Sequence, residues 1–191
     1  MRTQLKTLVA ALAIAGATVM PTTASAVSVG LELLLLTDVS GSVDANEYAL
    51  QKTGYVNAFN SAAVQNAITA TPGGIAVYYG EWSGASQQAT MVGWTHITNA
   101  TQASAFATAL AGTSRSFSGQ TAPGSALNWA YPLFNSNGFE GLREVIDVSG
   151  DGSQNDGANT AAARAAALAA GVDAINGLPI GGGATLVNWY T

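Results

Sequence analysis

The sequence predicts an α/β fold, a doubly wound (Rossmann-like), mostly parallel sheet with one antiparallel edge strand. The first observation is the continuous apolar run Val29–Thr37, which is typical of a strand buried on both faces. The second is the alternation of strand-like and helix-like segments, which favours a parallel sheet covered by helices. The third is the short Ser83–Ser86 connection, which allows only an antiparallel pairing of the two strands that it joins.

Each expected element has its own local signal. The expected strands are Val29–Thr37, Ile75–Trp82, Gln88–Thr95, Arg143–Ser149 and Val172–Ile180, and the expected helices are Asp44–Asn60, Asn99–Leu110, Ala126–Phe134 and Asn159–Ala170. Asp44 and Glu47 form a D-x-x-E pair, which is typical of a helix start. Gly171 follows the last helix and is suited to end it.

Residues 1–26 have the pattern of a secretory signal peptide. Arg2 and Lys6 give a basic start, the apolar run Leu8–Met20 follows, and Ala24-Ser25-Ala26 is a small-residue cleavage site. The run is shorter than the roughly 20 residues that a spanning helix needs. We therefore expect an exported chain, periplasmic or secreted, with no stable membrane span and one domain over residues 27–191. The alternative is an uncleaved anchor.

The composition restricts the classes of partner and chemistry. Only 9% of the residues are charged, against about 25% in typical globular proteins. Without Arg2 and Lys6, the 6 basic residues fall to 4 against 11 acidic residues, a formal net charge of −7. Such a chain is unsuited to nucleic acid, because that binding depends on Lys and Arg neutralising phosphates. Cysteine is absent, which excludes disulfides and thiol chemistry.

Three polar segments are expected at one edge of the sheet, where the carboxyl ends of parallel strands bind ligands. Asp38, Ser40 and Ser42 follow the first strand at alternate positions. Thr121 ends a polar loop at the start of a helix, and Asp151 follows the fourth strand on a glycine-flanked loop. The predicted topology brings these five side chains to the same edge.

Two carboxylates and three hydroxyls are hard oxygen donors, which suit Mg²⁺, Mn²⁺ or Ca²⁺ rather than zinc. Magnesium prefers octahedral coordination and usually keeps waters or ligand groups. Five protein groups therefore leave one position that an acidic side chain of a protein partner can fill. The alternative is a polar turn that binds no metal, because Asp and Ser also favour turns and helix caps.

The motif Asp38-x-Ser40-x-Ser42, the distant Thr121 and Asp151-Gly-x-x-Asn155 together resemble the metal-ion-dependent adhesion site (MIDAS) of von Willebrand factor type A (VWA) domains. The resemblance spans about Val29 to Ile180 and implies the same doubly wound fold. It also implies that the three hydroxyls ligate the metal directly, and that the two carboxylates bind directly or through water. The stretches GEWSG, FNSNGFEGLREVIDVSGDG and AAGVDAINGLPI further resemble an exported bacterial family, domain of unknown function 1194 (DUF1194).

Two features depart from the VWA pattern. Gln120 stands where a glycine commonly precedes the threonine, which is expected to alter that loop. The chain stops at Thr191, where the family fold usually continues with a further helix and strand. The resemblance therefore implies a C-terminally shortened domain or a fragment.

The leading interpretation is an exported, metal-dependent protein-binding module of the adhesion type that is not an enzyme. A metal-dependent hydrolase is the alternative, because carboxylates at a metal can activate water. That chemistry needs a nearby base or cation, but the only histidine, His96, lies on or after the edge strand, and the expected mature chain has a single lysine, Lys52. A third interpretation is a structural domain whose metal only ties loops together.

The roles of three further residues stay open at this stage. Glu81 and Trp82 end the second expected strand, near the expected site, and could either shape ligand preference or simply end a hairpin. Asp147 lies within an expected buried strand, as either a hydrogen-bonded structural group or a support for the metal ligands.

Overall fold

A five-stranded sheet forms the centre of the computed structural model, which describes residues 25–181 and 183–190. Its strands follow the order β4-β3-β2-β6-β7. They are β2 (Leu31–Asp38), β3 (Ile75–Trp82), β4 (Gln88–Ile97), β6 (Glu144–Gly150) and β7 (Ala174–Pro179). All neighbours pair in parallel except β3 and β4, which are antiparallel. The predicted fold class, including the antiparallel edge strand, is confirmed.

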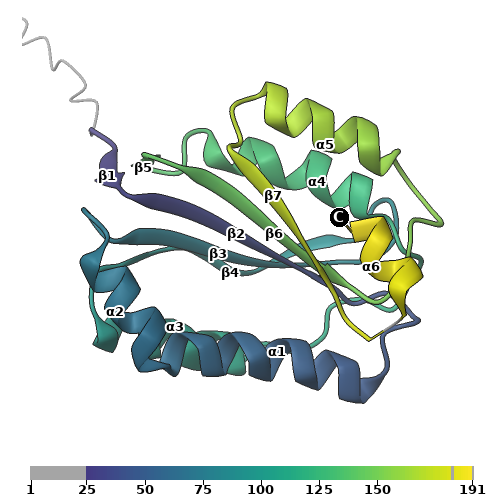
Figure 1. Ribbon diagram of the computed structural model, residues 1–191, viewed down its shortest axis with the longest axis horizontal. Helices are drawn as coiled ribbons and strands as arrows, with labels where there is room; N and C mark the ends of the chain where they lie inside the picture. The colour runs from purple at the N-terminus through teal and green to yellow at the C-terminus, as the bar shows by residue number, and fades with distance from the viewer. Residues whose placement is uncertain (1–24, 182, 191) are drawn as a thin grey trace, which may run out of the picture.

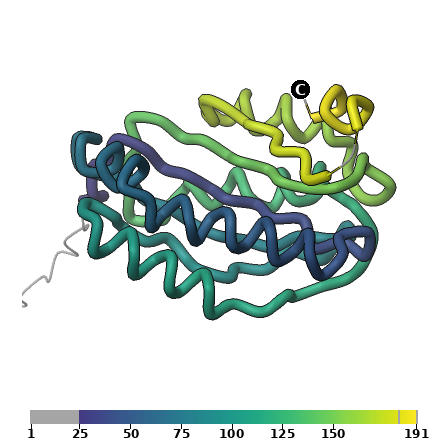
Figure 2. Tube along the Cα trace, turned by 60° about the horizontal axis from the view of Figure 1, so that its bottom comes forward, coloured from purple at the N-terminus to yellow at the C-terminus, as the bar shows by residue number. Residues whose placement is uncertain are grey.

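Helices cover both faces of the sheet (Figure 1). One face carries α1 (Ala45–Asn60), α2 (Ala62–Ala70) and α3 (Ala100–Ala111), and the other carries α4 (Pro123–Ala130), the 3₁₀ helix η1 (Tyr131–Phe134) and α5 (Thr160–Ala169). In Figure 2, α1 and α3 run side by side. A short last helix, α6 (Ala184–Tyr190), packs against β7.

The apolar strands explain why two helical layers form. Side chains alternate across a strand, so Leu34 and Leu36 of β2 face α4 and α5, whereas Leu35 faces α1 and α3. The same alternation holds in β3, where Tyr78 and Tyr79 belong to opposite cores. The central strands are therefore hydrophobic on both faces, and the sheet needs cover on both.

The start of α1 follows the predicted capping pattern. Asp44 Oδ1 accepts hydrogen bonds from the backbone amides of Asn46 (2.7 Å) and Glu47 (2.9 Å). Glu47 Oε2 accepts a return hydrogen bond of 2.9 Å from the Asp44 amide. This capping box satisfies amides that lack partners in the first helical turn. It also fixes the exit of the loop that carries Ser40 and Ser42, because α1 begins directly after that loop.

Several elements differ from the expectation. The second helix α2, the small parallel pair β1 (Val27–Val29) and β5 (Phe139–Gly141), and α6 are additional to the predicted elements. The predicted helix from Ala126 begins earlier, at Pro123, because proline is suited to the first helical turn. Its predicted end, Tyr131–Phe134, is a 3₁₀ turn.

No helix within residues 25–181 and 183–190 has the length and apolar character needed to cross a bilayer. The predicted leader lies almost entirely outside the described residues, so its cleavage stays a prediction.

A candidate metal site

The five predicted residues lie at the carboxyl edge of the parallel strands. Asp38 is the last residue of β2, and Asp151 follows directly after β6. These strands are neighbours, with Thr37 paired to Ser149, so both carboxylates leave the sheet at the same point. Thr121 comes just before α4 and joins them from a third segment.

Direct contacts connect the five side chains into one cluster. The Ser42 hydroxyl donates a 2.8 Å hydrogen bond to Asp151 Oδ1, and Ser42 Oγ lies 3.1 Å from Ser40 Oγ. The Thr121 hydroxyl donates to Ser40 Oγ at 3.3 Å. Asp38 Oδ1 accepts a 2.7 Å bond from the Ser40 amide. The structure thus brings together all five residues that the sequence singled out.

Asp38 is a buried carboxylate with a raised pKa, and one of its oxygens has no hydrogen-bond partner in the described structure. Its side chain is 0% exposed, and its Oδ2 is buried with no hydrogen-bond partner in the described structure. Burial raises the pKa of Asp38 to about 6, and the nearby charge of Asp151 adds to this shift. A buried carboxylate oxygen without a partner is unfavourable. A divalent cation would supply the missing interaction, so the residues present fit such an ion.

Asp151 is less buried than Asp38. Burial raises the pKa of Asp151 above its usual range, whereas the hydrogen bond from Ser42 opposes that rise. No group of three or more His, Cys, Asp or Glu capable of holding a metal is found within the described part of the chain. A cation here would therefore depend on the hydroxyls as well as on the two carboxylates.

The end of β2 is held by a buried glutamine from α1. Gln51 Nε2 donates to the backbone oxygen of Asp38 at 3.2 Å, and Gln51 Oε1 accepts from the Ser149 hydroxyl at 2.7 Å. The Val39 amide donates to the Trp82 carbonyl at 2.8 Å, which extends the ladder between β2 and β3 by one residue. These contacts fix the point at which the chain leaves the sheet.

The Thr121 loop is held by residues from two other loops. Ser83 Oγ donates to the Gln120 carbonyl at 3.0 Å and accepts from the Gly119 amide at 2.8 Å. The Thr121 amide donates to Asn155 Oδ1 at 2.8 Å, so the Asn of the D-G-x-x-N motif ties this loop to the Asp151 loop. Gln120 is exposed, and the loop accommodates it in place of glycine.

Sequence reasoning missed Arg115, which holds the loop after β2 through three hydrogen bonds. Its guanidinium donates to the carbonyls of Val39 (3.0 Å), Ser40 (2.6 Å) and Val43 (2.9 Å). The scarcity of basic residues was the one signal that could have drawn attention to Arg115. The long-range contacts themselves leave no sequence pattern.

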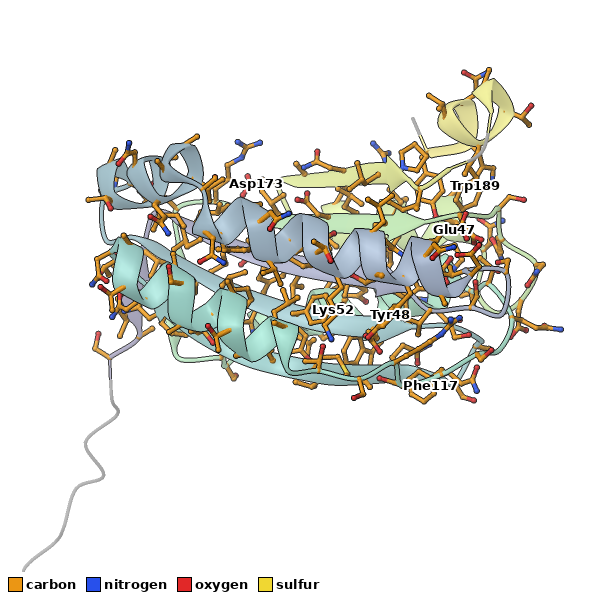
Figure 3. The ribbon with its side chains drawn as sticks, turned by 90° about the horizontal axis from the view of Figure 1, so that it is seen from below. Glu47, Tyr48, Lys52, Phe117, Asp173 and Trp189 are labelled. Atoms are coloured by element: carbon orange, nitrogen blue, oxygen red, sulfur yellow. The ribbon has the colours of Figure 1, made fainter. Side chains whose placement is uncertain are left out.

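Glu81, whose role the sequence left open, is a buried acceptor next to the segment that carries Arg115. It is 0% exposed and accepts hydrogen bonds from the Tyr48 hydroxyl (2.9 Å) and from the amide (2.8 Å) and hydroxyl (2.7 Å) of Ser116. In Figure 3, Tyr48 and Lys52 lie on the same side of α1, toward the segment that carries Phe117. Glu81 therefore holds residues that lie behind the cluster, Tyr48 and Ser116, and contacts none of the five clustered side chains itself.

The other open residues lie away from the cluster or inside the fold. Trp82 is 0% exposed and belongs to the core. Asp147 accepts a 2.7 Å bond from Asn176 on the neighbouring strand β7, which favours the structural interpretation. His96 pairs with Ala76 near the amino end of β3 and bonds to the Gly73 carbonyl, at the opposite end of the sheet from Asp38.

Residues 28–191 match the family described as protein of unknown function, DUF1194. The chain belongs to this family. Among curated proteins, none matches the sequence significantly.

Three solved VWA-domain proteins are similar in structure to this DUF1194 chain. Proximal thread matrix protein 1 of the mussel byssus has a TM-score of 0.62 and 17% identity, over 87% of this chain and 42% of its own. A further structure of that protein has a zinc-occupied MIDAS motif. An aerotolerance-related membrane protein from Bacteroides fragilis has a TM-score of 0.56 and 24% identity, over 80% of this chain and 68% of its own.

The pilus adhesin SpaC from Lactobacillus rhamnosus GG has a TM-score of 0.58 and 17% identity, over 78% of this chain and 24% of its own. At these identities the likeness shows the fold, which is VWA-like. The DUF1194 chain spans less than half the length of the byssus protein and about a quarter of the pilus adhesin.

Proposed function

We propose that this DUF1194 chain is an exported, divalent-cation-dependent protein-binding module of the adhesion type, and that it is not an enzyme. The observation that carries the proposal is a cluster of five oxygen-bearing side chains joined by hydrogen bonds, in which Asp38 Oδ2 is buried without a hydrogen-bond partner among the described residues. Ser40, Ser42 and Thr121 would hold the cation through hydroxyls, and Asp38 and Asp151 through carboxylates, directly or by way of water.

The donor set indicates which cation the site takes. All five groups are oxygen donors, without histidine or cysteine, and this favours Mg²⁺, Mn²⁺ or Ca²⁺. The byssus structure with zinc in its MIDAS motif supports the view that this fold can hold a divalent ion at such a motif. For an all-oxygen site we propose magnesium as the working ion, with manganese or calcium as substitutes.

A cation with five protein groups keeps room for one group from outside. An acidic side chain of a protein partner is suited to this place, because a carboxylate is a hard, negatively charged donor. Binding would then proceed through the metal and would need no proton transfer. The leader has a basic start, an apolar run and a small-residue cleavage site, and this pattern supports a location in the periplasm or outside the cell.

The surroundings of the cluster give little support to the hydrolase alternative. His96 lies at the far end of the sheet, and Arg115 already donates to backbone carbonyls. Lys52 donates to the carbonyl of Thr113. A hydrolytic site needs a general base or a cation free to stabilise the transition state, and these residues do not offer one beside the cluster.

Isothermal titration calorimetry of the mature chain with MgCl₂ and MnCl₂ tests the metal step. We expect a single binding event that Asp38→Ala removes, while circular dichroism shows that the fold is retained. An absence of any heat of binding from the wild-type chain with both ions would contradict the proposal.

Capture from an envelope extract tests the partner step. Immobilised wild-type chain should retain a protein in the presence of Mg²⁺ and release it with a chelator, and Asp38→Ala should not capture it. Metal binding without any metal-dependent capture would favour a structural role for the ion instead. Chelator-sensitive turnover of phosphate or peptide esters would favour the hydrolase.

A further inference from the structure

Arg115 uses its guanidinium in an unusual way for a chain with so few basic residues. Its hydrogen bonds go to backbone carbonyls: Nη1 donates to Val43, Nη2 donates to both Val39 and Ser40, and Nε donates to Phe117 at 3.0 Å. Three of these four acceptors belong to the loop that carries Ser40 and Ser42. Bonds from a charged donor are stronger than those between neutral groups.

Because each peptide is planar, fixing its carbonyl also fixes the direction of the following amide, and two of these amides make contacts at the site. In a trans peptide the carbonyl and the following amide point in opposite directions. When Arg115 holds the Val39 carbonyl, the Ser40 amide therefore points away from Arg115, and it donates to Asp38 Oδ1 at 2.7 Å. In the same way, the hold on the Ser40 carbonyl directs the Gly41 amide to the Gly119 carbonyl at 2.7 Å.

Arg115 thus orients two peptides with different targets. The first aligns the carboxylate of Asp38 through the Ser40 amide. The second joins the loop after β2 to Gly119, in the loop that ends at Thr121. In each case the amide that makes the contact points in the opposite direction from the carbonyl that accepts from the guanidinium.

Arg115 is connected to a buried acid, Glu81, through Tyr48 and the neighbouring Ser116. Its guanidinium carbon lies 5.8 Å from the centroid of the Tyr48 ring, within the range of a cation–π contact. The Tyr48 hydroxyl and the neighbouring Ser116 both donate to Glu81. Glu81 is 0% exposed, so its position is fixed by the core. The chain of contacts runs from the core through Glu81 and Tyr48 to Arg115.

We infer that Arg115 is a positioning residue of the metal site, which sets the loop Val39–Val43 in its binding geometry before a cation arrives. The inference rests on the proposed function for its metal readout. The geometry of the loop and the charge of Arg115 predict opposite changes in cation affinity when Arg115 is replaced. A positive charge close to the site opposes a cation, so removing it should strengthen binding if charge dominates, whereas loss of the loop bonds should weaken it if positioning dominates.

Two substitutions separate these effects. Arg115→Lys keeps the charge and loses the planar fork of donors, and Arg115→Met removes both. We expect each variant to bind Mn²⁺ at least about tenfold more weakly than wild type, because bonds from a charged donor each contribute on the order of a tenfold change. Arg143→Met, an exposed arginine at the amino end of β6, is the matched control and should bind as wild type does.

Hydrogen exchange of the metal-free chain supplies a readout that does not need the ion. In Arg115→Lys we expect faster exchange of the Ser40 and Gly41 amides, with exchange in the β2–β3 ladder unchanged. If Arg115→Met does not fold, Tyr48→Phe takes its place: it keeps the ring and loses the bond to Glu81, and it should shift both readouts in the same direction by less.

The outcomes distinguish the two ideas. Unchanged or tighter Mn²⁺ binding by Arg115→Lys and Arg115→Met would overturn the positioning role. So would unchanged exchange of the Ser40 amide in the metal-free chain. A wild-type chain that binds no ion, together with faster loop exchange in Arg115→Lys, would instead count against the proposed function and leave the hold of Arg115 on the loop intact.

Discussion

Tyr190 and Gly177 lie so close that a Cβ on Gly177 would be 2.4 Å from the Tyr190 carbonyl oxygen and 2.8 Å from its Cδ1. The same tyrosine reaches the end of β6, where a Cβ on Gly150 would be 2.3 Å from the Tyr190 hydroxyl and 2.8 Å from Asp38 Oδ2. Gly150 and Gly177, on neighbouring strands, therefore form the surface on which α6 packs, which we call the seat of α6. This seat lies next to Asp38 of the candidate metal site.

The substitution Gly177→Ala should displace α6. The added methyl group would meet the backbone of Tyr190, and overpacking of this kind costs about 1–3 kcal/mol. We expect faster hydrogen exchange in residues 184–190 and a lower melting temperature. Gly93→Ala is the matched control, because a Cβ on this strand glycine has no heavy atom within 4 Å. Equal exchange of α6 in the two variants would contradict this account of the seat.

The substitution Ser83→Ala should loosen the Thr121 loop. Ser83 is 0% exposed and both donates to Gln120 and accepts from Gly119, so its loss leaves two backbone groups without partners. Unsatisfied buried groups cost about 1–3 kcal/mol each. Denaturant unfolding should show this loss of stability, and calorimetry should show weaker Mg²⁺ binding. Ser118→Ala, at an exposed serine of the same loop, should leave both quantities unchanged.

The substitution Asp38→Asn should separate metal binding from stability. The amide keeps the shape of the side chain without its charge, so Mg²⁺ binding should disappear. At pH 7 the metal-free variant should unfold at a higher temperature than wild type, because removing a buried charge whose pKa is raised from 3.8 to about 6 stabilises the fold by about 3 kcal/mol. Thermal unfolding in the presence of a chelator measures this. A less stable Asp38→Asn chain would show that the buried carboxylate is already compensated without an ion.

Acidity should affect stability and metal binding in opposite directions. The folded-state pKa of Asp38 is about 6, against an ordinary value of 3.8, so the metal-free fold holds this proton more tightly than the unfolded chain. The resulting stabilisation is full below pH 3.8 and is lost as the pH rises through about 6. The raised pKa of Asp151 has the same sign. Chemical unfolding across this pH range should show that wild type loses stability as the pH rises, and that Asp38→Asn loses less.

Cation affinity should fall as the pH drops through about 6, because the proton competes with the metal for Asp38. Calorimetric titrations at a series of pH values would measure this fall. An affinity that is constant through this range would mean that Asp38 does not ligate the ion as a carboxylate.

The elements with strong periodic signals were predicted from sequence. The apolar run around Leu34–Leu36 and the Asp44–Glu47 cap are local patterns, and both are found in the structure. The grouping of Asp38 with Asp151 was also accessible, because strand order places the ends of β2 and β6 together. What these residues have in common is that their roles follow from neighbours in sequence or from the topology of the sheet.

The features that were missed depend on contacts between distant segments. The short pair β1 and β5 is held by pairing partners more than 100 residues apart in sequence. α6 follows a glycine run and takes its place through packing on Gly177. The hydrogen bonds from Arg115 to the Val39–Val43 loop, and its contact with Tyr48, join segments that lie far apart in the sequence. Local propensity carries no information about such partners.

The hydrogen bond between Ser42 and Asp151 joins residues 109 positions apart, one near the beginning of the domain and the other near its end. An ion held between them would act as a reversible cross-link, because it would favour the native chain over the unfolded one in proportion to its differential affinity. Depletion of divalent ions would then do more than release a partner. It would remove the cross-link between these two segments and expose their glycine-rich loops to proteases, so that the lifetime of the protein would follow the supply of the ion.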